Sequence, residues 1–121
     1  MPDDTYTGLT RDAAESRRLN LQHTLYIRAA GFHLHPRIAA HLPPDPHIAE
    51  VATGTGIWLR ELAAQSPAAW NFTGLDLSPD QFPSSLTEAE KGRVEFQVLD
   101  VLQEVPEEMR GRFDVVHVRL L

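Results

Sequence analysis

The sequence predicts an α/β protein in which helices flank a parallel β-sheet, and three observations support this fold class. The short apolar segment Ile48–Ala52, with a single charged residue, is typical of a strand buried on both faces. It is followed by a turn with Gly54 and Gly56, and then by a helical pattern of apolar residues that begins at Ile57. A second strand is predicted at Trp70–Leu77. A strand, a crossover helix and a further strand form the unit from which parallel sheets are built.

The segment before the first strand is expected to be mainly helical. Residues 1–9 are too polar and too short to fold alone, and they predict a flexible leader. A helix is expected from about Thr10 or Asp12 to Ala30, because its apolar residues form one broad stripe. With a proline-rich connector, this helix makes up an N-terminal region over residues 10–47.

Two further strands are predicted after Trp70–Leu77. They are the apolar segments Val94–Leu99 and Phe113–Val118. The crossover before the third strand begins with helix-breaking residues, and it predicts a loop followed by a short helix around Leu86–Lys91. The acidic segment Val101–Arg112 predicts one or two short helical turns.

The turn after the first strand has the properties of a ligand-binding loop. Gly54 and Gly56 let the backbone bend sharply and approach a ligand with no Cβ in between. The helix that begins at Ile57 directs its free N–H groups and the positive end of its dipole toward this turn. An anionic or carboxylate-bearing ligand is therefore expected there.

An acidic residue is predicted at the end of the second strand. Asp76 follows Gly56 by 20 residues, the spacing at which a carboxylate accepts hydrogen bonds from two ribose hydroxyls. The nucleoside ligand could be a dinucleotide or S-adenosylmethionine. A dinucleotide fingerprint has a third small residue where this chain has Leu59, so a nicotinamide-dependent oxidoreductase is only the third alternative.

The run Glu50–Gly56, EVATGTG, resembles the acidic-x-Gly-x-Gly-x-Gly motif of class I S-adenosylmethionine-dependent methyltransferases. Ala52 stands where that family usually has its first glycine, which narrows the room for the cofactor. Asp100, directly after the third strand, occupies the place of the family's acidic residue at the adenine amino group. FDVVHV, at Phe113–Val118, is similar to the family's FDxV/I segment.

A narrower resemblance is to the methyltransferases of fungal secondary metabolism, and it covers roughly Glu15 to Leu121. By this resemblance the N-terminal helix would cover the cofactor, with Gln22, His23 or Tyr26 near its methionine end. A helix that only covers the sheet is the simpler interpretation. The resemblance rests on the strings GTGIW, DLSPDQFP and HVRLL, and on Arg18, Leu19, Asn20, Gln22 and His23.

The resemblance implies an incomplete Rossmann-like methyltransferase fold, with about four parallel strands in the order 3-2-1-4, flanking helices and an N-terminal helical extension. It assigns the ribose to Asp76, and the adenine to Asp100 with Val101. No catalytic base is identified, although His117 and Arg119 could contact the substrate or the methionine carboxylate. The residues expected to bind S-adenosylmethionine are Glu50, Thr53, Gly54, Thr55, Gly56, Asp76, Leu77, Asp100 and Val101.

The leading interpretation is methyl transfer to an unidentified small molecule, with residues 48–121 supplying the cofactor-binding half. About seven strands are typical of the family, and the sequence predicts four, which lack the later strands of the acceptor pocket. The alternative is a truncated, inactive methyltransferase-like fragment or a regulatory chain. Such a chain could pair with a partner through the exposed edge of the fourth strand.

Composition argues against several other classes. The 17 acidic residues outnumber the 11 Lys and Arg, for a formal net charge of −6, so no nucleic-acid partner is expected. The absence of cysteine excludes disulfides and thiolate metal sites. His33 and His35 have no acidic residue at ligand spacing, so no metal is expected.

No apolar run reaches the ~20 residues of a membrane span, and the N-terminus is not a secretory signal. No membrane partner is expected, and the expected location is cytoplasmic, with the nucleus as the alternative.

Overall fold

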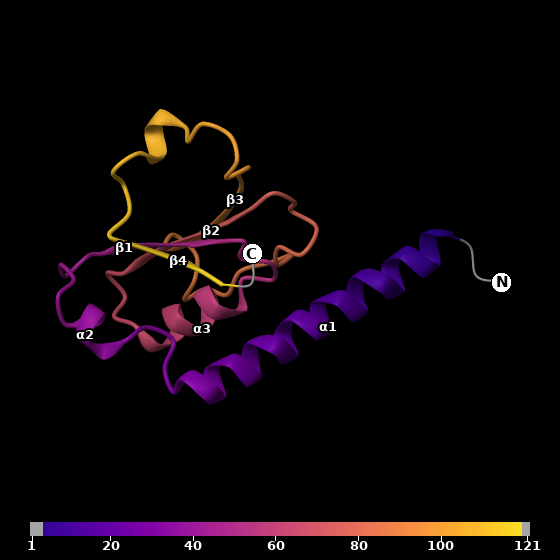
Figure 1. The fold of residues 1–121 in the computed structure, drawn as a ribbon, viewed down its shortest axis with the longest axis horizontal. Coiled ribbons are helices and arrows are strands. Elements are labelled where there is room, and N and C mark those ends of the chain that lie inside the picture. The colour runs from indigo at the N-terminus through magenta and orange to yellow at the C-terminus, as the bar shows by residue number, and fades with distance from the viewer. Residues whose placement is uncertain (1–3, 120–121) are drawn as a thin grey trace.

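The computed structural model describes residues 4–119, and the side chains from Ala13 to Arg119. In chain order its elements are α1 (Asp4–Ala30), α2 (Pro36–Ala39), β1 (His47–Val51), α3 (Ile57–Gln65), β2 (Asn71–Asp76), β3 (Val94–Val98), the 3-10 turn η1 (Glu107–Met109) and β4 (Val115–Val118). Figure 1 shows α3 on one side of the sheet and the long segment that contains η1 on the other. In the same view α1 extends beyond the sheet toward the N-terminus.

The four strands form one sheet in the order β3-β2-β1-β4, and each strand pair is parallel. This confirms the predicted order 3-2-1-4. Glu50 on β1 lies opposite Gly74 on β2 and His117 on β4. The carboxyl ends of the strands therefore share one edge of the sheet, which is where open α/β sheets bind ligands.

Both faces of β1 are buried, as its apolar sequence predicts. Ile48 packs on the α3 side, whereas Ala49 packs on the other side with Leu75 and Met109. Removal of apolar surface from water, at about 25 cal/mol per Å², holds α3 against the sheet. The core on the α3 side consists of Ile48, Trp58, Leu59, Leu62, Ala63, Phe72 and Val94.

The N-terminal helix is longer than the sequence predicts. α1 begins at Asp4, so that residues 4–9, expected to form part of a flexible leader, are helical. Once a helix has nucleated, each added residue gains a backbone hydrogen bond, and no proline interrupts this segment. Residues 1–3 lie outside the described part. The helix ends at Ala30 as predicted, and Gly31 follows with a φ of 85°.

The short helix expected around Leu86–Lys91 is absent, and hydrogen-bonded turns over residues 88–93 take its place. Thr87 and Glu90 form reciprocal bonds. The amide of Thr87 donates to Oε1 of Glu90 at 2.8 Å, and the amide of Glu90 donates to Oγ1 of Thr87 at 3.3 Å. This capping arrangement starts a helical turn, but Gly92, with a φ of 84°, ends it before a second turn forms.

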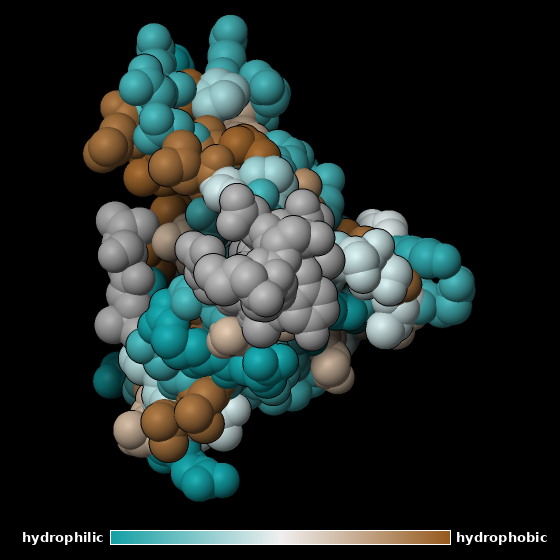
Figure 2. Space-filling model, turned by 90° about the vertical axis from the view of Figure 1, so that its right-hand side faces the viewer, coloured by the Kyte–Doolittle hydropathy of each residue, from teal (hydrophilic) through white to brown (hydrophobic). Residues whose placement is uncertain are grey.

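Apolar side chains are exposed at β4 and in the segment between β3 and β4. In the described part of the chain β4 pairs only with β1, and Val116 and Val118 are 57% and 50% exposed. Figure 2 shows hydrophobic residues gathered at the top of the molecule, where Figure 1 places the segment between β3 and β4. The exposed apolar residues of that segment are Val101, Leu102 and Val105. None of the helices within residues 4–119 is long and apolar enough to span a membrane.

Candidate functional site

The loop between β1 and α3 is built from residues with left-handed backbone conformations. Ala52, Gly54 and Gly56 have φ angles of 57°, 59° and 77°. The amide of Thr53 donates to the carbonyl oxygen of Leu75 at 3.0 Å, and the amide of Gly56 donates to the carbonyl oxygen of Thr53 at 2.9 Å. The first bond holds the loop against β2, and the second closes the loop on itself just before α3 begins at Ile57.

Ala52 occupies the position where the resemblance leads one to expect glycine. Its φ of 57° lies in the left-handed region, which explains why glycine suits this position. A residue with a Cβ loses about 1–2 kcal/mol in the left-handed region. We expect Ala52→Gly to raise the free energy of unfolding by about 0.5–1 kcal/mol, the relieved strain less the added chain entropy. The midpoint of urea denaturation should rise without a change in slope.

The same substitution at Ala64, an exposed residue of α3, provides the control for that prediction. Ala64→Gly should lower stability by about 1 kcal/mol, because glycine is a poor helix former. A destabilised Ala52→Gly variant would contradict the account of strain at this position.

Asp76 meets the glycine loop at the end of β2. Its Oδ2 accepts a hydrogen bond from the amide of Gly54 at 2.9 Å, and its Oδ1 accepts a long one from the amide of Ser78 at 3.5 Å. The side chain is only partly buried. The carboxylate therefore keeps acceptor capacity for a ligand beside the loop.

The space next to Gly56 is filled by an aromatic ring. A Cβ at Gly56 would lie 2.4 Å from Cε1 of Phe96, and a Cβ at Gly74 would lie 2.5 Å from Cδ1 of the same ring. The absence of a Cβ at both glycines therefore leaves room for the ring of Phe96, a residue of β3, on the α3 side of the sheet. The sequence predicts that the missing Cβ of Gly56 lets a ligand approach, and the contact with Phe96 is a second reason for glycine at this position.

Glu50 is buried behind the loop and connects it to β4. Oγ1 of Thr53 donates to Oε1 of Glu50 at 2.7 Å, and Nδ1 of His117 lies 3.1 Å from Oε2. The His117 ring also stacks on Trp58, with ring centroids 3.8 Å apart and planes 8° apart. His117 is thus held between a carboxylate and an indole ring.

Helix α1 lies over the glycine loop. Oγ1 of Thr55 donates to Oδ1 of Asn20 at 2.7 Å. Beneath the helix is a cavity of about 80 Å³, which Arg119 lines together with the loop. Nη1 of Arg119 is buried without a partner among the described residues, and its Nη2 lies 2.5 Å from Nδ1 of His23. The cavity is lined by Leu19, Gln22, His23, Glu50, Ala52, Thr53, Gly54, Thr55, Ile57 and Arg119.

Five of the nine predicted cofactor residues do not line this cavity, and three of them, Leu77, Asp100 and Val101, lie away from it. Leu77 is 66% exposed, and Oδ1 of Asp100 accepts a hydrogen bond from the amide of Leu102 at 2.9 Å. Val101 lines a separate apolar cavity of about 630 Å³, on the face of the sheet to which Ala49 points. Of the nine predicted residues, the cavity is lined by Glu50, Thr53, Gly54 and Thr55. Gly56 is the next residue of the same loop, and Asp76, at the end of β2, is bonded to the loop at Gly54.

The structure also assembles a group that the sequence analysis missed. His23 of α1, His33 of the following connector and Glu61 of α3 share hydrogen bonds, although 28 and 38 residues separate Glu61 from the two histidines. Burial, the largest influence, raises the pKa of the Glu61 carboxyl, but the hydrogen bonds and charges of His33 and His23 outweigh it and lower the pKa. His35, by contrast, accepts a hydrogen bond from the amide of Arg37 and is the N-cap residue of α2.

The fold, the glycine loop and the acidic strand end define a class of protein. The methyltransferase domain family matches residues 48–121, more than half of the chain. The chain belongs to this family, and its sheet has the strand order expected of the class I methyltransferase fold.

Curated fungal methyltransferases are similar to the chain over nearly its whole length. Methyltransferase grgD of Penicillium sp is 38% identical and is matched by 99% of this chain, which covers 43% of that protein. N-methyltransferase tcpN of Claviceps purpurea is 33% identical, with 93% of this chain and 39% of that protein covered. N-methyltransferase gliN of Aspergillus fumigatus is 34% identical, with 93% of this chain and 38% of that protein covered. The chain therefore spans about two-fifths of the length of these relatives.

Proposed function

We propose that this chain binds S-adenosylmethionine and supplies the cofactor-binding part of an enzyme that methylates a small molecule. The hydrogen bond between Gly54 and Asp76 carries this proposal, because it joins the glycine loop to the acidic end of the neighbouring strand. A carboxylate in that position suits two adjacent ribose hydroxyls. The names of tcpN and gliN favour nitrogen as the acceptor atom.

The cavity under α1 suits the amino-acid end of the cofactor. Nη1 of Arg119 is a buried cationic donor with no partner within residues 4–119, and a carboxylate would satisfy it. Small-molecule pockets usually measure about 300–1,000 Å³, so a cavity of about 80 Å³ has room for one end of the cofactor only. The proposed residues for the ribose and adenine are Asp76, Leu77, Asp100 and Val101.

Bound S-adenosylmethionine supplies an activated methyl group on sulfur, so the protein's contribution is mainly positioning. Asp76 and Arg119 would orient the two ends of the cofactor. Glu50 and Thr53 keep the loop in place, and α1 shields it from water. No side chain is assigned as a base.

We expect the Asp76→Asn variant to bind S-adenosylmethionine about 10- to 100-fold more weakly than the unchanged chain. Hydrogen bonds to a charged group contribute about 1.5–3 kcal/mol, and the amide has lost one acceptor oxygen. The remaining oxygen of the amide can still accept from Gly54, so the loop should keep its shape. Isothermal titration of the cofactor into both proteins measures the difference.

Asp80→Asn is the matched control, because Asp80 is an exposed carboxylate in the next turn and should bind the cofactor as before. No binding to the unchanged chain at millimolar cofactor would contradict the proposal. Binding of NADH in its place would favour the oxidoreductase alternative. Binding without methyl transfer to any acceptor would favour a regulatory or partner-binding chain, for which the exposed edge of β4 is the proposed contact.

A further inference from the structure

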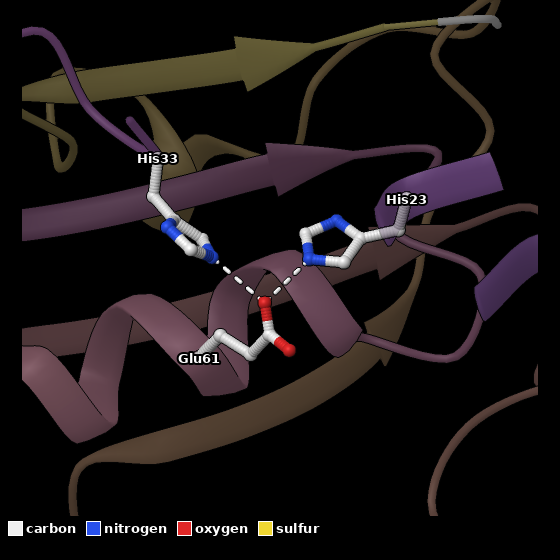
Figure 3. A group of neighbouring side chains, drawn as sticks. All are labelled: His23, His33 and Glu61. Carbon is white, nitrogen blue, oxygen red and sulfur yellow. Dashed lines mark hydrogen bonds and ion pairs between the residues drawn. The ribbon is translucent and has the colours of Figure 1, made fainter. Parts of the chain in front are cut away.

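Two imidazole rings converge on one carboxylate outside the glycine loop. Nε2 of His23 lies 2.5 Å, and Nε2 of His33 lies 2.7 Å, from the same oxygen of Glu61 (Figure 3). The ligand atoms of these residues all lie within 4.8 Å of one another. The side chains of His23 and His33 are 1% and 10% exposed, whereas that of Glu61 is 45% exposed. The group is thus walled by the two rings and open to solvent at the carboxylate.

We propose that His23, His33 and Glu61 form a binding site for a divalent transition-metal ion, and that Zn²⁺ is the ion they suit best. Two imidazoles and one carboxylate are a known ligand set of zinc sites in which the protein supplies three ligands and water supplies the fourth. Zinc bonds of about 2.0–2.2 Å put neighbouring ligand atoms about 3.4 Å apart in a tetrahedron. The present contacts need to open by less than about 1 Å to reach that spacing.

The second nitrogen of each ring decides whether the site can form. A ring that binds metal through Nε2 carries its proton on Nδ1, and an outer acceptor usually holds that proton. Nδ1 of His33 lies 3.4 Å from the side-chain nitrogen of Gln65. Rotation of the Gln65 carboxamide would present its oxygen to that nitrogen, and the two orientations are structurally equivalent. Gln65 can therefore support His33 as a ligand.

His23 is held in the opposite state. Arg119 can only donate, so its 2.5 Å contact makes Nδ1 of His23 an acceptor and leaves the ring proton on Nε2. Metal binding requires that proton to move to Nδ1, and Arg119 must then turn away. Because Arg119 and His23 both line the cavity under α1, occupation of the metal site would release Nη2 of Arg119 beside the glycine loop.

Two titrations of the untagged 121-residue chain test this site. Co²⁺ binding is followed by visible absorption, and the affinity for Zn²⁺ is measured by competition with a chromophoric chelator. We expect one ion per chain. His33→Ala should weaken Zn²⁺ binding by at least about 100-fold. Loss of a residue that only supports a metal ligand through a hydrogen bond costs up to about 100-fold, and loss of the ligand itself should cost more. Glu61→Gln should also weaken it, although the glutamine oxygen can still accept from both rings and preserve the fold.

Arg119→Gln gives the most discriminating result. A glutamine oxygen can accept the Nδ1 proton of metal-bound His23, so this variant should bind Zn²⁺ about 10-fold more tightly. His35→Ala is the matched control and should bind as the unchanged chain does, since His35 contacts Arg37 and lies outside the group. Absence of saturable Co²⁺ uptake, equal binding by His33→Ala, or equal or weaker binding by Arg119→Gln would overturn the proposal. Circular dichroism verifies that each variant is folded.

Discussion

The Gly74→Ala variant is expected to lose about 2–3 kcal/mol of unfolding free energy, the upper part of the range for overpacked cores. The new methyl group would lie 2.5 Å from Cδ1 of Phe96 and 3.0 Å from Cγ2 of Thr53. Gly74 is in β2, which is paired on both sides, so its backbone cannot retreat. Urea denaturation measures the loss.

A comparison of Gly56→Ala with Gly92→Ala separates contact from backbone strain. The two glycines have similar φ angles, 77° and 84°, but only Gly56 faces Phe96, and nothing lies within 4 Å of a Cβ at Gly92. Gly92→Ala should lose about 0.5–1 kcal/mol, the strain of the left-handed conformation less the smaller entropy of the unfolded alanine chain. Gly56→Ala should lose at least about 1 kcal/mol more.

A smaller side chain at position 96 should rescue the overpacked variant. In the double variant Gly74→Ala, Phe96→Leu, the destabilisation should fall short of the sum of the single effects by about 1 kcal/mol or more. Strict additivity of the two changes would show that the Phe96 ring is not what Gly74 accommodates.

The Glu90→Gln variant is expected to be destabilised by about 2 kcal/mol at neutral pH. Both oxygens of Glu90 accept hydrogen bonds of 2.7 Å from Arg60. The Arg60 hydrogen bond, the largest cause, lowers the pKa of Glu90 from 4.5 to about 2. The expected loss is smaller than this shift alone implies, because the Arg60 side chain is 30% exposed and solvent screens the pair.

The same ion pair predicts sensitivity to acid. Between pH 4.5 and about 2 the unfolded chain binds a proton at Glu90 that the folded chain does not, so this contribution to stability is complete above pH 4.5 and disappears as the pH falls through that window. The Glu90→Gln variant should show a shallower decline of stability over this range. Chemical denaturation at a series of pH values measures both slopes.

Glu88→Gln is the control for Glu90, because the Glu88 side chain is 90% exposed in its contact with Lys91. Its stability should stay within about 0.5 kcal/mol of the unchanged chain. An equally large loss in both variants would indicate a general effect of negative charge and would contradict the specific role of the Arg60 pair.

Most of the fold could be predicted because its signals are local. β1, β2 and β3 lie within one or two residues of the predicted segments, and α3 begins at Ile57 as its apolar periodicity indicates. The strand order was predicted by resemblance. The predicted start of α1 and the predicted short helix before Gly92 were wrong, because the ends of helices depend more on nucleation and capping than on apolar periodicity.

The candidate site was only partly predictable. The 20-residue spacing from Gly56 to Asp76 predicted the contact between the glycine loop and the end of β2, since both lie at the carboxyl ends of neighbouring parallel strands. The roles of the nine predicted residues stay predictions. The positions of Leu77, Asp100 and Val101 away from the cavity under α1 depend on the path of the chain beyond each strand, which strand patterns do not specify.

By itself, the sequence determined the parallel α/β architecture, the order of its elements, the glycine loop and the acidic residue at the end of β2, because each is encoded within a short run of neighbouring residues. Only the tertiary structure decided that Phe96 fills the space beside two glycines, that α1 covers the loop above the guanidinium of Arg119, and that two histidines share one carboxylate. These contacts join residues far apart in the chain. Their geometry follows from how α1, α3 and the sheet pack, which no local pattern contains.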